Sequence, residues 1–154
     1  MVGKVTLHRY MRIKTLLRQE PFLKNNRVGV RRLVRLRAGV ERLQVVRGRF
    51  RGVERSKRCC LVCGSGEVED ELHFIEECEM LCDQRRELWS NIARTSMHDC
   101  MKMRLDLMTV HERVDWLLGS EVHRREWKWR DLQTVILNGL GKMFMGRCRT
   151  GYVK

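Results

Sequence analysis

The chain has 154 residues, of which 43% are hydrophobic, with a formal net charge of +13 and seven cysteines. This length fits one domain, or one domain with a basic arm. The sequence contains no apolar run of the roughly 20 residues that cross a bilayer and no secretory signal at its start, so no membrane partner is expected. An odd number of cysteines, two of them in a C-x2-C pair near a histidine, favours metal binding and free thiols. It points to a reducing intracellular compartment, the nucleus or cytoplasm.

Charge is distributed unevenly along the chain. Residues 1–58 hold 18 Lys/Arg against 3 Asp/Glu, a net of +15. Residues 59–100 hold 3 against 10, a net of −7, and residues 101–154 hold 11 against 6, a net of +5. A stretch as basic as the first predicts a polyanion as partner, most commonly nucleic acid, and the alternative is a merely solvated surface.

The basic stretch is expected to be helical in its first two thirds. Apolar spacing predicts one helix over 5–19 and a second from Asn25-Asn26 to Ala38, with Gly39 at its C-terminal end. The apolar residues expected to be buried by the second helix are Val30, Leu33, Val34 and Leu36. Residues 40–58 lack a helical period, so Gly48–Gly52 is interpreted as a flexible basic loop and 53–59 as a short strand.

A cluster of potential metal ligands follows: Cys60, Cys63, His73 and Cys78, with the spacing C-x2-C-x9-H-x4-C. Four soft or borderline ligands in about twenty residues fit a closed tetrahedral Zn²⁺ site of CCHC type. Glycines directly after Cys63 suit the tight turn that such a site needs. The alternative is ordinary buried cysteines with a surface histidine, and Cys59 leaves the identity of the first ligand open.

Helices are also expected beyond the cluster, which makes the fold class mainly α. Asp70 is a candidate N-cap for a short helix, and apolar stripes predict longer helices at 80–95, 102–118 and 122–147. We expect a small helical domain built around a CCHC zinc knuckle, with a basic helical N-terminal arm. The predicted segments are a basic helical arm and loop (1–58), a CCHC zinc module (59–99) and a C-terminal helical pair (100–154).

No catalytic pattern accompanies these elements. The chain has no Asp-Asp pair of the polymerase type, no Gly-rich phosphate loop, and no His-Glu arrangement typical of deaminases or metalloproteases. Four protein ligands leave no open position on the metal, so a structural role is expected for it. The sequence therefore predicts no catalytic residues and no enzyme activity.

The order of these motifs resembles the C-terminal Cys/His region of non-LTR (LINE-type) retrotransposon reverse transcriptase polyproteins. The likeness is carried by Leu36–Gly39, Gly48–Phe50, Arg58–Cys63, Val68–Phe74 and Cys78, and it spans roughly 5–95. Where that family often has proline after the last cysteine, this chain has Glu79. The resemblance implies that the four ligands bind zinc and that the chain grips template RNA or target DNA as part of, or a derivative of, a larger polyprotein.

The residues expected to contact nucleic acid lie in 27–58: Arg31, Arg32, Arg35, Arg47, Arg49, Phe50 and Arg51. Guanidinium groups suit phosphate oxygens, and Phe50 can stack on an unpaired base. The alternative for Phe50 is packing against the zinc module. The sequence does not distinguish RNA from DNA as the partner, and oligomeric state is left open. The competing interpretation is an intracellular zinc-stabilised protein-interaction module that docks a partner on 102–147.

Overall fold

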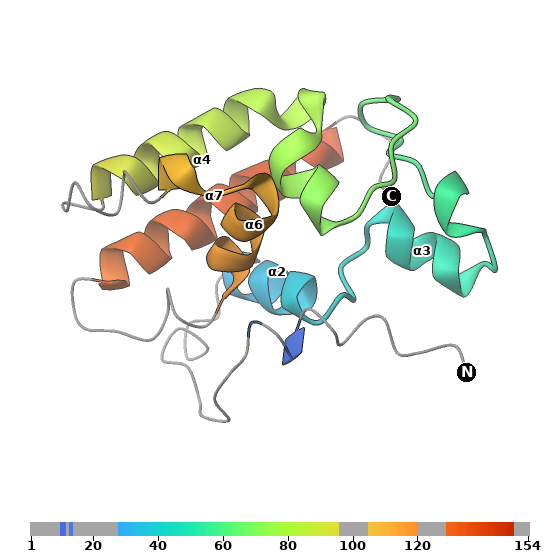
Figure 1. The fold of residues 1–154 in the computed structure, drawn as a ribbon, viewed down its shortest axis with the longest axis horizontal. Coiled ribbons are helices and arrows are strands. Elements are labelled where there is room, and N and C mark those ends of the chain that lie inside the picture. Colours follow the sequence, from blue (N-terminus) through green and yellow to red (C-terminus); the bar gives the residue numbers. More distant parts are fainter. Residues whose placement is uncertain (1–9, 12, 14–27, 96–104, 120–128, 150–154) are drawn as a thin grey trace.

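The computed structural model describes residues 10, 11, 13, 28–95, 105–119 and 129–149, which form a small, mainly helical domain (Figure 1). This confirms the predicted fold class. The α-helices named in the figure, in chain order, are α2 (Val28–Arg37), α3 (Gln44–Phe50), α4 (Cys82–Thr95), α6 (Val110–Leu118) and α7 (Trp129–Arg149). Shorter helical turns are η2 (Arg55–Lys57), η3 (His73–Glu77) and η4 (Glu79–Leu81).

Helix α7 is the centre of the packing. Helices α4 and α2 both pack against it, and α6 contacts α2 and η3 (Figure 1). The side chains in this core that are fully buried include Leu33, Leu36, Phe74, Ile75, Leu88, Ile92, Leu117, Leu118 and Ile136. The core thus takes residues from all three predicted segments, while the division into those segments stays a prediction.

Helix α2 ends where the sequence predicted, but its buried face differs. Gly39 adopts a positive φ of 62°, and the N–H groups of Gly39 and Val40 donate to the carbonyls of Leu36 and Arg35, which closes the last turn. Val34, expected inside, is exposed. Its place on the inner face is taken by Arg37, whose guanidinium donates to backbone carbonyls at the C-terminal end of α6.

Residues 40–58 contain a helix that the sequence did not predict. Helix α3 takes in the first three residues of the loop expected over Gly48–Gly52, and the remaining two form a turn with Gly52 at φ 66°. The expected strand over 53–59 is also wrong, because η2 lies there. Strand-like pairing in the described residues is limited to an isolated antiparallel bridge between Cys59 and Val68.

The later helices lie close to the predicted ranges where the structure describes them, with α4 and α7 ending at Thr95 and Arg149, but one of them is interrupted. The helix expected from 102 breaks at Met108, and α6 starts after Thr109, which forms a reciprocal capping box with Glu112. The described part of the last helix begins at Trp129. Most of the helix predicted over 5–19 lies outside the described residues, although Ile13 is buried in the core.

None of the described helices is long and apolar enough to cross a membrane.

Candidate metal centre and basic surface

The four predicted ligands come together in one cluster. One donor atom each from Cys60, Cys63, His73 and Cys78 lies within 4.8 Å of all the others. In a tetrahedral zinc site with Zn–S bonds of about 2.3 Å, neighbouring sulfurs are separated by about 3.8 Å. The cluster therefore needs only a small contraction to close around one ion. Cys60, His73 and Cys78 are buried, and Cys63 is partly exposed.

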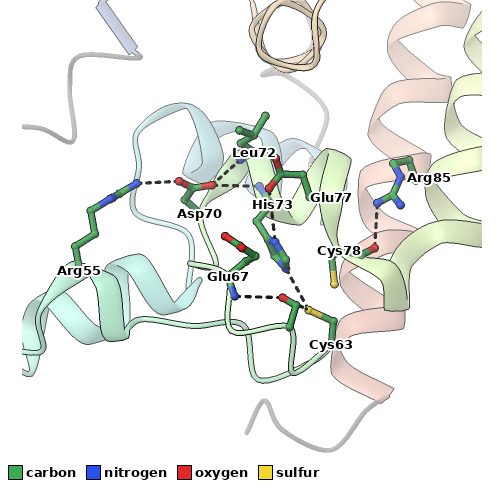
Figure 2. Close-up of polar contacts among 10 residues, drawn as sticks. Arg55, Cys63, Glu67, Asp70, Leu72, His73, Glu77, Cys78 and Arg85 are labelled. Carbon is green, nitrogen blue, oxygen red and sulfur yellow. Dashed lines mark hydrogen bonds and ion pairs between the residues drawn. The ribbon is translucent and has the colours of Figure 1, made fainter.

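Local backbone structure explains why these side chains converge, and Figure 2 shows three of them, Cys63, His73 and Cys78. The first two cysteines lie on a tight turn in which the N–H of Gly64 donates to the carbonyl of Cys60. Gly64 and Gly66 have φ values of 66° and 81°, which glycine adopts without strain. The N–H of Cys60 also donates to the carbonyl of Glu67, which pins the turn to the returning chain.

A short helical turn supplies the other two ligands. The Asp70 carboxylate accepts hydrogen bonds from the N–H groups of Leu72 and His73, each at 3.1 Å, so its predicted role as an N-cap is confirmed. His73 opens the single wide turn η3, and the N–H of Cys78 donates to the carbonyl of His73 at 2.7 Å. Arg85 from α4 donates to the Cys78 carbonyl and fixes the far end of the turn (Figure 2).

The histidine ring is oriented for metal binding through Nε2. His73 Nε2 lies 3.4 Å from Cys63 Sγ, inside the cluster. The other ring nitrogen, Nδ1, faces the Glu77 carboxylate at 3.7 Å (Figure 2). Metal-bound histidines commonly have a carboxylate at the second nitrogen, because it fixes the tautomer and orientation of the ring.

The electrostatics of Cys60 and Cys78 favour a bound cation. A hydrogen bond from Cys78 lowers the pKa of the Cys60 thiol to about 4, although burial opposes this shift. The same shared proton, together with burial, raises the pKa of Cys78. The two thiols thus share one proton, and several thiolates in this small volume need a positive ion to balance their charge. The donor set of three sulfurs and one imidazole fits Zn²⁺.

Of the two adjacent cysteines, the structure places Cys60 and not Cys59 in the cluster. Cys59 lies beside the cluster in sequence, but its Sγ contacts the carbonyl of Ser56 at 3.4 Å. It is not part of the group that could hold a metal. Residues 59 and 60 alternate across the short paired segment, so only Cys60 points inward.

The segment 59–78, which carries the four clustered residues, is called the knuckle below. A buried ion pair links the knuckle to α7 and α3. Arg147 donates to both carboxylate oxygens of Glu69, from Nε at 2.6 Å and from Nη2 at 2.9 Å, and both side chains are at most 3% exposed. The carboxylate also accepts the N–H of Gln44, the first residue of α3, at 2.7 Å. Because 78 residues separate the two charges, no local sequence pattern could have indicated the pair.

The predicted nucleic-acid contacts divide into exposed and internal groups. Arg31, Arg35, Arg49 and Arg51 are exposed, and Phe50 is 79% exposed with the Arg49 guanidinium 5.1 Å from its ring centre. Packing of Phe50 against the zinc module is therefore excluded.

Two of the predicted arginines are less accessible. Arg32 bonds to the buried Glu41 carboxylate at 2.7 Å and lies 4.5 Å from the ring centre of Phe144. Arg47 is half-buried. The net charge of the arm also includes arginines that are not at the surface, because Arg37 is buried and Arg58 is half-buried with hydrogen bonds to backbone carbonyls.

Comparisons with protein-family models, with curated proteins and with solved structures gave no match for this chain.

Proposed function

We propose that this protein is a zinc-stabilised nucleic-acid-binding module. Its Cys/His cluster can hold a metal ion, and zinc is the ion that prefers three thiolates and an imidazole in tetrahedral geometry. With four protein ligands the metal supports the fold, because no coordination position is left for a substrate. Cys60, Cys63, His73 and Cys78 are the residues that hold it.

The observation that supports nucleic acid as the partner is an exposed aromatic ring among exposed arginines. Phe50, Arg49 and Arg51 lie at the C-terminal end of α3, and Arg31 and Arg35 are exposed on α2. Arginines provide charge and bidentate geometry for phosphates, and an exposed phenyl ring provides a face for a base. Neither feature by itself distinguishes RNA from DNA.

The proposal assigns no catalytic role to this chain. Neither primer extension nor magnesium-dependent cleavage is expected from the purified protein. The order of the sequence motifs favours an origin as the tail of a retrotransposon reverse transcriptase, and this part of the proposal rests on the sequence resemblance.

Metal content tests the first half of the proposal. We expect one zinc per chain in native mass spectrometry, lost in Cys63→Ser and retained in Cys59→Ser and Cys148→Ser, since the last two cysteines lie outside the cluster. Loss of zinc in Cys59→Ser with retention in Cys63→Ser would contradict the assigned ligands.

Salt dependence of oligonucleotide affinity tests the second half. The double variant Arg49→Ala/Arg51→Ala should lower the slope of log K against log salt by about 1.4, at about 0.7 per phosphate contact with a single strand. The matched control is Arg86→Ala/Arg94→Ala, which changes two exposed arginines of α4. Neither belongs to the basic surface, by which we mean the exposed residues Arg31, Arg35, Arg49, Phe50 and Arg51. Labelled single strands of RNA and DNA are titrated in parallel. A wild-type slope near zero would favour the protein-interaction alternative instead.

A further inference from the structure

Helix α3, which carries Phe50 and its flanking arginines, is too short to be stable alone. It has 7 residues, and isolated helices below about 12–15 residues are marginal in water. The residue before it, Leu43, provides no side-chain cap. Its conformation must therefore come from contacts with other parts of the molecule.

Those contacts come from the chain segment that enters and leaves the metal cluster. At the N-terminus of α3, Glu69 accepts two hydrogen bonds, with its carboxylate from Gln44 N–H at 2.7 Å and with its carbonyl from Val45 N–H at 3.1 Å. On the flank of the helix, Arg58 donates to the Val45 carbonyl at 2.9 Å. Arg58 also packs so closely on Gly48 that an added Cβ would lie 2.6 Å from its side chain.

The same segment is paired across the knuckle. The N–H of Glu69 donates to the Arg58 carbonyl at 3.0 Å, and the N–H of Cys60 donates to the Glu67 carbonyl at 2.8 Å. The first predicted ligand, Cys60, follows Arg58 by two residues, and His73 follows Glu69 by four residues. Metal binding that fixes Cys60 and His73 therefore fixes the two residues that hold α3.

We propose that the metal cluster controls an interaction surface for single-stranded nucleic acid, with Glu69 as the positioning residue between the two. This inference rests on the proposed function. Single strands are favoured because Phe50 is 79% exposed beside the Arg49 guanidinium, and the bases of a duplex are already stacked on one another. Removing the metal, or the Glu69 carboxylate oxygen that caps α3, lets α3 unfold, so Phe50 and Arg49 lose their fixed positions.

Two zinc-loaded double variants isolate the capping oxygen. Glu69→Leu/Arg147→Met removes it, and Glu69→Gln/Arg147→Met keeps an acceptor for the Gln44 N–H. Both variants remove the buried charge pair together, because leaving one buried charge unpaired would strongly destabilise the domain. Hydrogen exchange of α3 amides should be about tenfold faster in the Leu variant than in the Gln variant. Amides of α4 and α7 should exchange alike in both. Equal α3 exchange would overturn the role of Glu69.

Chelation tests the link to the metal in the wild-type chain. Zinc removal by a chelator should abolish protection of α3 amides together with that of the knuckle amides of Cys60 and Gly64. Protection of α3 that survives while the knuckle amides exchange freely would overturn the inference. Loss of protection in α4 and α7 as well would show that the metal holds the whole domain and not this surface in particular, which would overturn its specific control of α3.

Binding measurements separate this inference from the proposed function. A labelled single-stranded oligonucleotide should bind the zinc-loaded Leu variant several-fold more weakly than the Gln variant, and Phe50→Ala should lose about tenfold for the single strand but little for a duplex hairpin. Equal losses for strand and hairpin would refute the preference for single strands. If α3 protection follows zinc but no oligonucleotide binds, the proposed function fails and the structural coupling stands.

Discussion

The close crossing of α2 and α7 predicts opposite effects for two Gly→Ala substitutions. A Cβ at Gly29 in α2 would lie 2.2 Å from the carbonyl oxygen of Leu137 and 2.7 Å from its carbonyl carbon. Contacts this short are with backbone, so no side chain can turn aside to relieve them. The two helices would have to separate by about 1 Å, which weakens dispersion contacts along their shared face.

The expected cost follows from this clash. Forcing an extra carbon into a packed helix interface typically lowers the free energy of unfolding by about 1–3 kcal/mol. The higher helix propensity of alanine over glycine raises it by at most about 1 kcal/mol. Gly29 lies in the first turn of α2, where the gain from propensity is small. Gly29→Ala should therefore lower the free energy of unfolding by about 1–3 kcal/mol.

The control is Gly141→Ala in the interior of α7. An added Cβ there meets no atom within 4 Å, so only the gain from propensity applies and the variant should be stabilised by about 0.5–1 kcal/mol. Urea unfolding of the zinc-loaded proteins measures both changes as shifts in midpoint at constant slope. A Gly29→Ala variant at least as stable as Gly141→Ala would refute the crossing described here.

Two further predictions concern α6 and α2. Hydrogen bonds from the Thr109 backbone and side chain lower the pKa of Glu112, so its stabilising contribution is present above its unfolded-state pKa and is lost as pH falls through the lower folded-state value. Urea unfolding at several pH values should show the gap between wild type and Glu112→Gln narrowing on acidification, and Thr109→Ala should cost about 1 kcal/mol at neutral pH. Arg37→Met should cost about 1–3 kcal/mol by calorimetry, because buried carbonyls at the end of α6 lose their donor, while the exposed Arg35→Met should stay within about 0.5 kcal/mol.

The cluster of Cys60, Cys63, His73 and Cys78 could be predicted because its pattern is local. All four lie within 19 residues, and each part of the geometry depends on near neighbours. Gly64 makes the turn after the first pair, and Asp70 caps the turn that starts at His73. Helix α2 was predicted for the same reason, since an apolar stripe and Gly39 mark its body and its end.

Helix α3 could not be predicted because its stability is not local. The stretch Gln44–Phe50 has no amphipathic period, and its N-terminal acceptor is Glu69, 25 residues away. The burial of Arg37 could not be predicted for a related reason. It follows Leu33 by four residues and so shares the inner face of α2, but its partners are carbonyls 81 and 82 residues further along the chain.

The division of the arginines changes how the basic charge should be interpreted. Net charge treats each arginine as equally able to meet a phosphate, yet Arg37 and Arg58 donate to backbone carbonyls and Arg32 bonds to a buried carboxylate. Those guanidinium groups hold α2, α3 and the knuckle in place. The described residues that remain exposed, such as Arg49 and Arg51, form a smaller surface whose position depends on the internal ones. The described arginines therefore have two separable roles. Variants of the internal group should lower the free energy of unfolding, whereas variants of the exposed group should change the salt dependence of oligonucleotide affinity.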